Sequence, residues 1–174
     1  MNRPSRHGLV ILTAAALFAC TERSPELAPP SSAVPSALHD LAADSNLNGD
    51  WQTRDRILGI AVRWGEDDSG GIFSIDRIEL STLEQLLADN FVDPSDQQNE
   101  APTVAQIVAF LRSHPGTYAF GYAVSPARSD YRVSLEGIAV PHATVTPELR
   151  SAVETFCQDA DETGDEPYVY CWWD

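Results

Sequence analysis

The sequence predicts an α+β domain: an antiparallel sheet of about five strands, in the order ββααββαβ along the chain, with helices packed on one face. Three observations support this prediction. Short runs rich in β-branched and aromatic residues are separated by turn signals. Stretches with helical spacing of apolar residues lie between some of these runs. The chain of 174 residues is long enough for one domain with its own core.

The first expected strands are residues 56–64 (RILGIAVRW) and 72–80 (IFSIDRIEL). Both runs are rich in Ile, Val, Leu and Phe, which suit a half-buried strand. The segment GEDDSGG between them has the composition of a turn. The two runs therefore predict a β-hairpin.

Two helices are expected to follow this hairpin. Ser81 with Glu84 three residues later has the spacing of a capping box and predicts a helix that runs to about Asp89. Thr103 is the expected N-cap of the second helix, which ends before His114. The apolar residues that recur at helical spacing in this second helix are Val104, Ile107, Val108 and Leu111.

The C-terminal half predicts three more strands and one helix. Residues 118–124 and 131–140 are β-rich and are joined by a short polar segment, so they predict a second strand pair. Pro147 suits the first position of a helix that runs to about Cys157. Residues 168–173 (YVYCWW) predict the last strand. Side chains alternate along a strand, so we expect the aromatic residues on one face to lie in the core and those on the other face to be free to form a stacking platform.

The N-terminus has the pattern of an export signal. Arg3 and Arg6 precede an apolar run over residues 9–19, which ends at Cys20. This run is too short to span a bilayer, which takes about 20 apolar residues. The segment Leu17-Phe18-Ala19-Cys20 resembles the lipobox of bacterial lipoproteins.

The lipobox resemblance implies that residues 1–19 are a signal peptide and that Cys20 carries the lipid anchor. Thr21, where sorting to the inner membrane uses aspartate, implies an outer-membrane location facing the periplasm if the cell is Gram-negative. Residues 20–36 are rich in Pro, Ser, Ala and Glu without apolar periodicity, and they predict a flexible tether. Residues 37–174 are the expected single globular domain.

The chain is strongly acidic, with 26 Asp and Glu against 11 basic residues and a net charge of −15. All the basic residues are arginine, which excludes lysine-dependent chemistry such as a Schiff base or a Walker loop. The charge disfavours nucleic acid as a partner, because phosphate binding needs clustered cations. It is compatible with a basic protein partner or with divalent cations, although solubility alone is the simpler explanation.

Cys157 and Cys171 remain as an even pair if Cys20 is lipidated. In an oxidising compartment such a pair predicts a structural disulfide. Closing a 15-residue loop in this way contributes about 3 kcal/mol to stability in the chain-entropy model. The alternative is two free buried thiols.

Residues 44–55 match the calcium-loop template, with Gly49 at the sixth position for the sharp bend. The expected calcium ligands, in chain order, are Asp44, Asn46, Asn48, the backbone carbonyl of Asp50, and Asp55. The loop resembles those of EF-hands and, more closely, of dockerin modules, which implies a structural calcium ion. The alternative is an Asx-rich surface turn without an ion.

The sequence contains few features typical of a catalytic site. The sequence has no G-x-S-x-G, phosphate loop or G-x-G-x-x-G motif. His39, His114 and His142 lack metal-ligand spacing and are expected to be ordinary surface or capping residues. The acidic stretch 159–166 lacks a closing carboxylate for calcium and is expected to be a solvated loop.

Three classes of function are compatible with these features. The first is a lipid-anchored binding or inhibitor protein of the cell envelope, of the immunity type, with a basic partner. The second is a structural or assembly component of the envelope. The third is a hydrolase of cell wall or glycan, which needs two carboxylates facing each other across a cleft. The anchor, the tether, the acidity and the absence of catalytic motifs support the first class, and the same features support the second.

Overall fold

The computed structural model describes residues 46–174. The expected signal peptide, the lipid-attachment residue Cys20, the tether, His39 and the first calcium ligand Asp44 lie outside the described residues. Within residues 46–174, no helix combines the length and the apolar character needed to cross a membrane.

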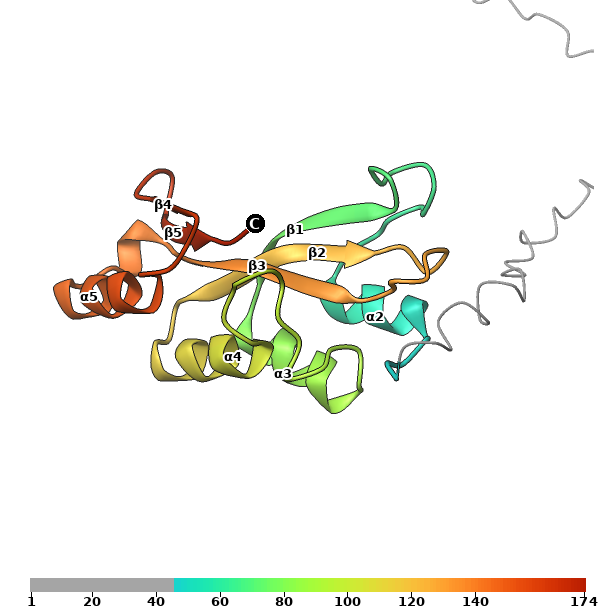
Figure 1. Ribbon diagram of the computed structural model, residues 1–174, viewed down its shortest axis with the longest axis horizontal. Helices are drawn as coiled ribbons and strands as arrows, with labels where there is room; N and C mark the ends of the chain where they lie inside the picture. The colour runs from blue at the N-terminus through green and yellow to red at the C-terminus, as the bar shows by residue number, and fades with distance from the viewer. Residues whose placement is uncertain (1–45) are drawn as a thin grey trace, which may run out of the picture. The chain divides into compact units, whose positions relative to one another are not determined.

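Five strands form one antiparallel sheet with the spatial order β1-β2-β3-β5-β4 (Figure 1). The strands are β1 Ile72–Ile78, β2 Tyr118–Val124, β3 Val133–Val140, β4 Glu162–Gly164 and β5 Val169–Trp172. Consecutive strands β2 and β3 pair along most of their length, whereas β5 pairs with only the second half of β3. The predicted α+β fold with a five-stranded antiparallel sheet is therefore confirmed.

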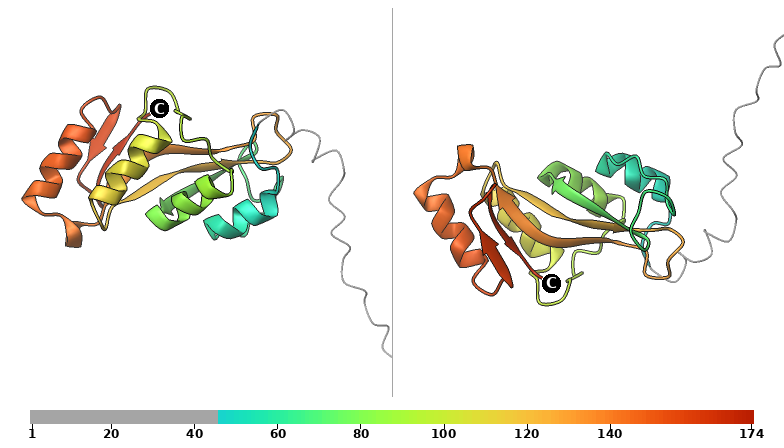
Figure 2. Two further views of the ribbon diagram at one scale, coloured as in Figure 1. Left: turned by 90° about the horizontal axis from the view of Figure 1, so that it is seen from below. Right: turned by 90° about the horizontal axis from the view of Figure 1, so that it is seen from above.

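The described helices pack on one side of this sheet. They are α2 Trp51–Leu58, α3 Leu80–Ala88, α4 Val104–Ser113 and α5 Pro147–Phe156, with a short 3-10 helix η2 at His142–Thr144. In the view from below, α3, α4 and α5 are on the near side of the domain. In the view from above, the strands are on the near side (Figure 2). The opposite face of the sheet is covered by no helix of the described chain.

The core lies between the sheet and these helices. Leu83 and Leu86 of α3 and Ile107 and Leu111 of α4 are almost fully buried, and they meet Ile138 of β3 in one apolar cluster. Removing such a side chain from water contributes about 1.5–3 kcal/mol each. The helical spacing of these residues explains their burial, because positions three and four apart share one face of a helix.

The expected strand at residues 56–64 is wrong. Residues Trp51–Leu58 form α2 instead, and only β1 of the expected hairpin is a strand. Asp50 caps this helix by accepting a hydrogen bond from the Thr53 N–H at 3.1 Å, and Gly59 ends it in the left-handed conformation at φ 69°. An N-cap carboxylate and a C-terminal glycine therefore outweigh the β-propensity of the residues between them.

The helix starts are partly as predicted. Thr103 and Gln106 form a complete capping box on α4, and Pro147 lies at the start of α5, as expected. The expected capping box of Ser81 with Glu84 is wrong, because α3 begins earlier, at Leu80. The Glu84 carboxylate instead pairs with Arg112 of α4 at 2.7 Å and links the two helices.

The acidic stretch 159–166 is not entirely a loop. Its residues Glu162–Gly164 form the edge strand β4, which pairs with β5. Tyr170 lies over Gly164, where a Cβ atom would come within 2.2 Å of its ring, and it donates a hydrogen bond to Glu162. The small residue therefore allows an aromatic ring to pack on the edge of the sheet, a tertiary contact that the charge of the segment does not predict.

Arg54 of α2 is completely buried. Its guanidinium pairs with Asp55 at 2.7 Å and donates to the Val124 carbonyl at 2.7 Å. It lies between the rings of Trp64 and Tyr131, at 5.2 Å and 4.6 Å from their centroids. Trp64 donates its indole N–H to the second oxygen of Asp55 at 2.8 Å. This Arg54 cluster joins α2 to the ends of β2 and β3.

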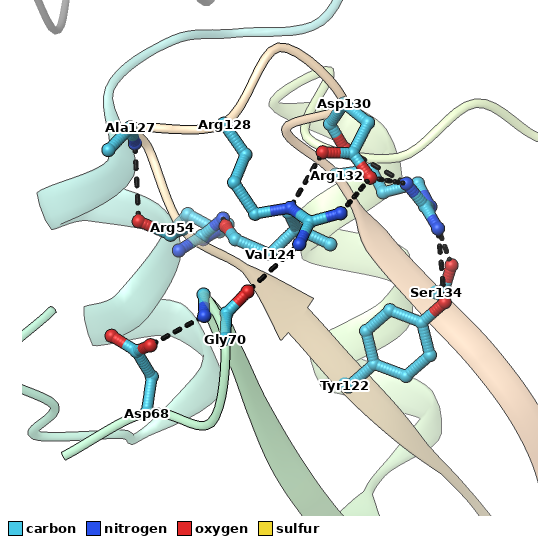
Figure 3. Close-up of polar contacts among 12 residues, drawn as sticks. Arg54, Asp68, Gly70, Tyr122, Val124, Ala127, Arg128, Asp130, Arg132 and Ser134 are labelled. Atoms are coloured by element: carbon cyan, nitrogen blue, oxygen red, sulfur yellow. Dashed lines mark hydrogen bonds and ion pairs between the residues drawn. The ribbon is translucent and has the colours of Figure 1, made fainter. Parts of the chain in front are cut away.

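The loop between β2 and β3 carries a second set of ion pairs (Figure 3). Arg128 and Arg132 both contact Asp130, at 2.8 Å each, and hold the pKa of its carboxyl well below the usual range. Arg128 also reaches the Gly70 carbonyl at 2.8 Å, across from the start of β1. Arg132 donates to the Tyr122 hydroxyl at 3.0 Å. These contacts fix the loop onto neighbouring strands.

Cys157 and Cys171 form a disulfide, with an S–S distance of 2.03 Å and Cα atoms 5.8 Å apart. The bridge joins the C-terminal end of α5 to β5. Both half-cystines are buried in the core cluster. The disulfide therefore holds α5 against the end of the sheet.

Replacing Arg54 with leucine is expected to lower the free energy of unfolding by about 3–5 kcal/mol, because Asp55 then remains buried without its partner. Urea unfolding followed by circular dichroism measures this change. Replacing Arg54 and Asp55 together by leucine is expected to recover part of the loss, since no uncompensated charge remains.

Tyr131→Phe is the matched control within the same cluster. The Tyr131 hydroxyl is buried without a hydrogen-bond partner in the described part of the chain, and burial raises its pKa to about 12. Its removal should therefore change stability by less than about 1 kcal/mol. A near-wild-type stability for Arg54→Leu would contradict the role given to the Arg54 cluster.

Candidate functional site

A groove of about 950 Å³ lies on the surface of the described domain. It lies between α4, α5 and the segment 97–102 that leads into α4. Figure 2 shows α4 and α5 side by side beneath the sheet. We refer to this cavity as the α4–α5 groove.

Aromatic side chains form the floor of the α4–α5 groove. The rings of Phe110 and Phe156 stack at 4.3 Å between centroids, and His114 lies 4.3 Å from Phe110 on the same helix. Trp173 meets Phe156 edge to face at 6.2 Å. The four rings therefore form a continuous aromatic cluster from α4 across α5 to the last residues of the chain, in which Phe110 and Trp173 are buried and His114 and Phe156 are partly exposed.

Carboxylates line the rim of the groove: Glu100 before α4, Glu148 in the first turn of α5, and Asp159 after α5. No ion pair with an arginine of residues 46–174 involves any of the three. Hydrogen bonds from its own backbone N–H and from the Thr146 side chain lower the pKa of Glu148. The groove therefore presents negative charge above an aromatic floor.

The walls of the groove are held by local contacts. The segment before α4 is tied to that helix by hydrogen bonds from the N–H of Val104 to the Asp96 carbonyl and from Ala105 to the Pro94 carbonyl, at 3.0 and 2.9 Å. Ala101 of this segment is buried. The disulfide holds the other wall, α5. These constraints place the groove between rigid elements, which favours binding of a preformed shape.

The described part of the expected calcium loop makes other contacts. Asn48 accepts from the Asp50 N–H at 3.0 Å, and the Asp50 carboxylate caps α2. The backbone carbonyl of Asn46 accepts from Asn90 at 2.7 Å. Both oxygens of Asp55 are engaged by the Arg54 cluster. Calcium binding stays a prediction, because Asp44 lies outside the described residues.

The other residues singled out in the sequence, the histidines and the C-terminal aromatic residues, lie in different places in the structure. His114 lies in the α4–α5 groove, whereas His142 is half-exposed and lies 3.9 Å from the Glu166 carboxylate. Trp173 is buried in the groove floor, whereas Tyr168 is the most exposed large aromatic residue described, at 42%. Within residues 46–174, no three His, Cys, Asp or Glu side chains gather as a metal site.

The groove itself was not predicted from the sequence. Its residues come from four separate segments, and linear sequence does not show which helices become neighbours. The sequence offers only a weak indication of this groove: the first turn of α5 is acidic, whereas α4 contains no acidic residue. Tertiary packing of Phe110 on Phe156 creates the site.

Comparisons of this chain with protein-family models, with curated proteins and with solved structures found no match. The function is therefore inferred from the geometry and charge of the sites.

Calcium is expected to raise the thermal unfolding temperature of the full chain if the loop 44–55 binds it. Saturating calcium should stabilise the fold by about 1–3 kcal/mol, because the ion binds the folded loop. Thermal unfolding with calcium and with chelator measures the shift. Asp44→Ala should abolish it, while magnesium at the same concentration serves as control. Equal unfolding temperatures with calcium and chelator would refute the calcium site.

Proposed function

We propose that this chain is a lipid-anchored binding protein of the cell envelope, which holds a basic segment of a protein partner in the α4–α5 groove. The observation that carries the proposal is the groove itself: three carboxylates that pair with no arginine of residues 46–174, beside four contiguous aromatic rings. An arginine or lysine side chain fits both features, since its charge meets the rim and its stem packs on the floor.

The size of the groove supports a peptide segment as its occupant. A volume of about 950 Å³ lies near the upper end of the range for ligand pockets, which is roughly 300–1,000 Å³. Among residues 46–174, the lining of the groove includes three carboxylates and no arginine, which favours a cationic segment. The acidic chain also favours fast association with a basic partner through long-range attraction.

The lipid anchor gives the proposal its location. Cys20 would hold the protein at the membrane surface, and the tether of residues 20–36 would let the domain reach a partner in the same compartment. An inhibitor of the immunity type would meet its target there, before the target acts on the envelope.

The groove is tested by capture from envelope extracts with the full chain as bait. Wild-type protein should retain a basic protein in equal stoichiometry. The double variant Glu148→Gln with Asp159→Asn should bind that protein about fivefold more weakly, because two screened charge contacts are lost. Titration of the purified partner by calorimetry measures the change, and higher salt should weaken wild-type binding in the same direction.

Asp89→Asn with Glu154→Gln is the matched control, since it removes two exposed charges that do not line the groove. Its affinity should equal that of the wild type. Capture of a multiprotein assembly would instead support a structural envelope component, and turnover of wall fragments would support a hydrolase. Equal weakening by both double variants would refute the groove as the binding site.

Lowering the pH should weaken the part of binding that depends on Glu148, because protonation removes its charge from the rim. Hydrogen bonds lower the pKa of Glu148, so it keeps its charge to a lower pH than an ordinary glutamate. The difference in affinity between the wild type and Glu148→Gln should therefore persist as the pH falls through the range in which an ordinary glutamate titrates, and calorimetry at decreasing pH measures it.

The anchor is tested separately with Cys20→Ser. This variant should leave the membrane fraction or stay as an unprocessed precursor, because the lipid is attached to the cysteine sulfur. Fractionation and mass spectrometry measure both outcomes. Unchanged membrane attachment of Cys20→Ser would contradict the lipobox interpretation.

A further inference from the structure

A second cavity, of about 280 Å³, lies on the face of the sheet that the described helices leave uncovered. Its walls are the rings of Tyr118 and Phe120 from β2, Tyr170 from β5, and Tyr168 just before β5. Two carboxylates complete it, Asp76 from β1 and Glu166 from the segment after β4. We call this cavity the sheet-face pocket.

The aromatic rings of the sheet-face pocket are fixed in orientation. Tyr118 and Tyr168 meet nearly at right angles, with an interplanar angle of 79° and centroids 6.1 Å apart. Phe120 lies over Gly137, where a Cβ atom would come within 2.2 Å of the ring. The absence of a side chain at Gly137 therefore leaves room for the Phe120 ring, as Gly164 does for Tyr170. The rings of Tyr118 and Tyr168 form a corner of the pocket.

A bulge in β1 supplies one of the two carboxylates. The register between β1 and β2 shifts between Ile75 and Ile78, and Asp76 and Arg77 are both exposed in this interval. A bulge changes the direction of side chains in this way. Asp76 has no ion-pair partner among the described residues, and Glu166 lies 3.9 Å from His142.

One ring of the sheet-face pocket already contacts a cation. The Arg77 guanidinium lies 4.3 Å from the centroid of Tyr118, and it also pairs with Glu79. The lining of the pocket includes no arginine or histidine. Two carboxylates and four aromatic rings line the pocket, while Arg77 lies against Tyr118 and His142 lies near Glu166.

We propose that the sheet-face pocket binds a small organic ammonium cation, of the quaternary type. Aromatic faces attract such a cation through the ring quadrupole, and carboxylates at the edge add a charge of opposite sign. The volume lies just below the usual range for drug-sized ligands, which suits a headgroup-sized molecule. A sugar is the competing occupant, because its hydroxyls donate hydrogen bonds to carboxylates, but it lacks the positive charge that interacts with both the carboxylates and the ring faces.

Choline is the probe for this proposal, with the full chain as receptor. Titration followed by nuclear magnetic resonance should shift the backbone amide signals of Gly137 and Ala139, which lie under the pocket. The neutral analogue 3,3-dimethylbutan-1-ol has nearly the same shape without the charge. We expect it to bind about tenfold more weakly than choline, because the cation–π and charge terms are lost.

Two kinds of variant separate the charge from the aromatic contribution. Asp76→Asn with Glu166→Gln should weaken choline binding about fivefold, while Asp89→Asn with Glu154→Gln should leave it unchanged. Tyr168→Ala should weaken binding by a similar factor, and Tyr168→Phe should retain it because the ring remains. Tyr168 is largely exposed, so its truncation leaves the core intact; thermal unfolding checks this.

Three outcomes would overturn the proposal. The first is equal affinity for choline and its neutral analogue, which would show an apolar site. The second is unchanged choline binding in the Asp76→Asn, Glu166→Gln variant. The third is saturable binding of glucose or N-acetylglucosamine at the same amide signals without binding of choline, which would show a saccharide site. Failure of the Tyr168→Ala variant to fold leaves the charge variants as the decisive comparison.

Discussion

The buried ion pair of Arg54 with Asp55 is the constraint on which the arrangement of α2 and the sheet depends. A guanidinium removed from water needs a charge partner and hydrogen bonds, and few positions supply both. Here Asp55 gives the charge, the Val124 carbonyl accepts a second hydrogen bond, and Trp64 and Tyr131 cover the two sides of the plane. Since these groups come from α2, the segment after it and the ends of β2 and β3, none of those elements can shift without exposing the pair.

The same cluster explains where sequence reasoning succeeds and where it fails. Strands β2, β3 and β5 and helices α4 and α5 follow from β-propensity, apolar periodicity and local capping, which are all visible in the chain. Helix α2 does not, because Ile57, Leu58 and Ile60 suggest a strand while the Asp50 cap, the Gly59 terminus and the long-range contacts of Arg54 favour a helix. The α4–α5 groove also lies beyond prediction, since Phe110 and Phe156 become neighbours only through tertiary packing. Local signals therefore predict elements, and the sites arise from contacts between distant elements.

The two faces of the sheet have different roles because of where the helices lie. On the covered face, packing of α3 and α4 forms the core, and the edge of this packing against α5 leaves the acidic groove. On the uncovered face, Gly137 and Gly164 give room for aromatic rings that no helix shields. Small residues beneath these rings therefore leave room for the sheet-face pocket. The disulfide of Cys157 with Cys171 connects the two regions, because it joins α5 at the groove to β5 beside the pocket.

The distribution of arginine explains why both cavities are negative. Among the described residues, every arginine except Arg56 forms an ion pair with a carboxylate, and most of these pairs are close in sequence or join neighbouring elements. The chain has no lysine, so arginine supplies all its permanently charged side-chain cations, and among residues 46–174 only Arg56 is left without a carboxylate partner. The carboxylates of the same residues that pair with no arginine include Glu100, Glu148 and Asp159 at the groove and Asp76 at the sheet-face pocket. The arginines thus stabilise the fold internally, while the unpaired carboxylates determine the surface charge. A ligand that reaches either cavity meets aromatic rings and negative charge together, and a positively charged group is the chemistry that satisfies both.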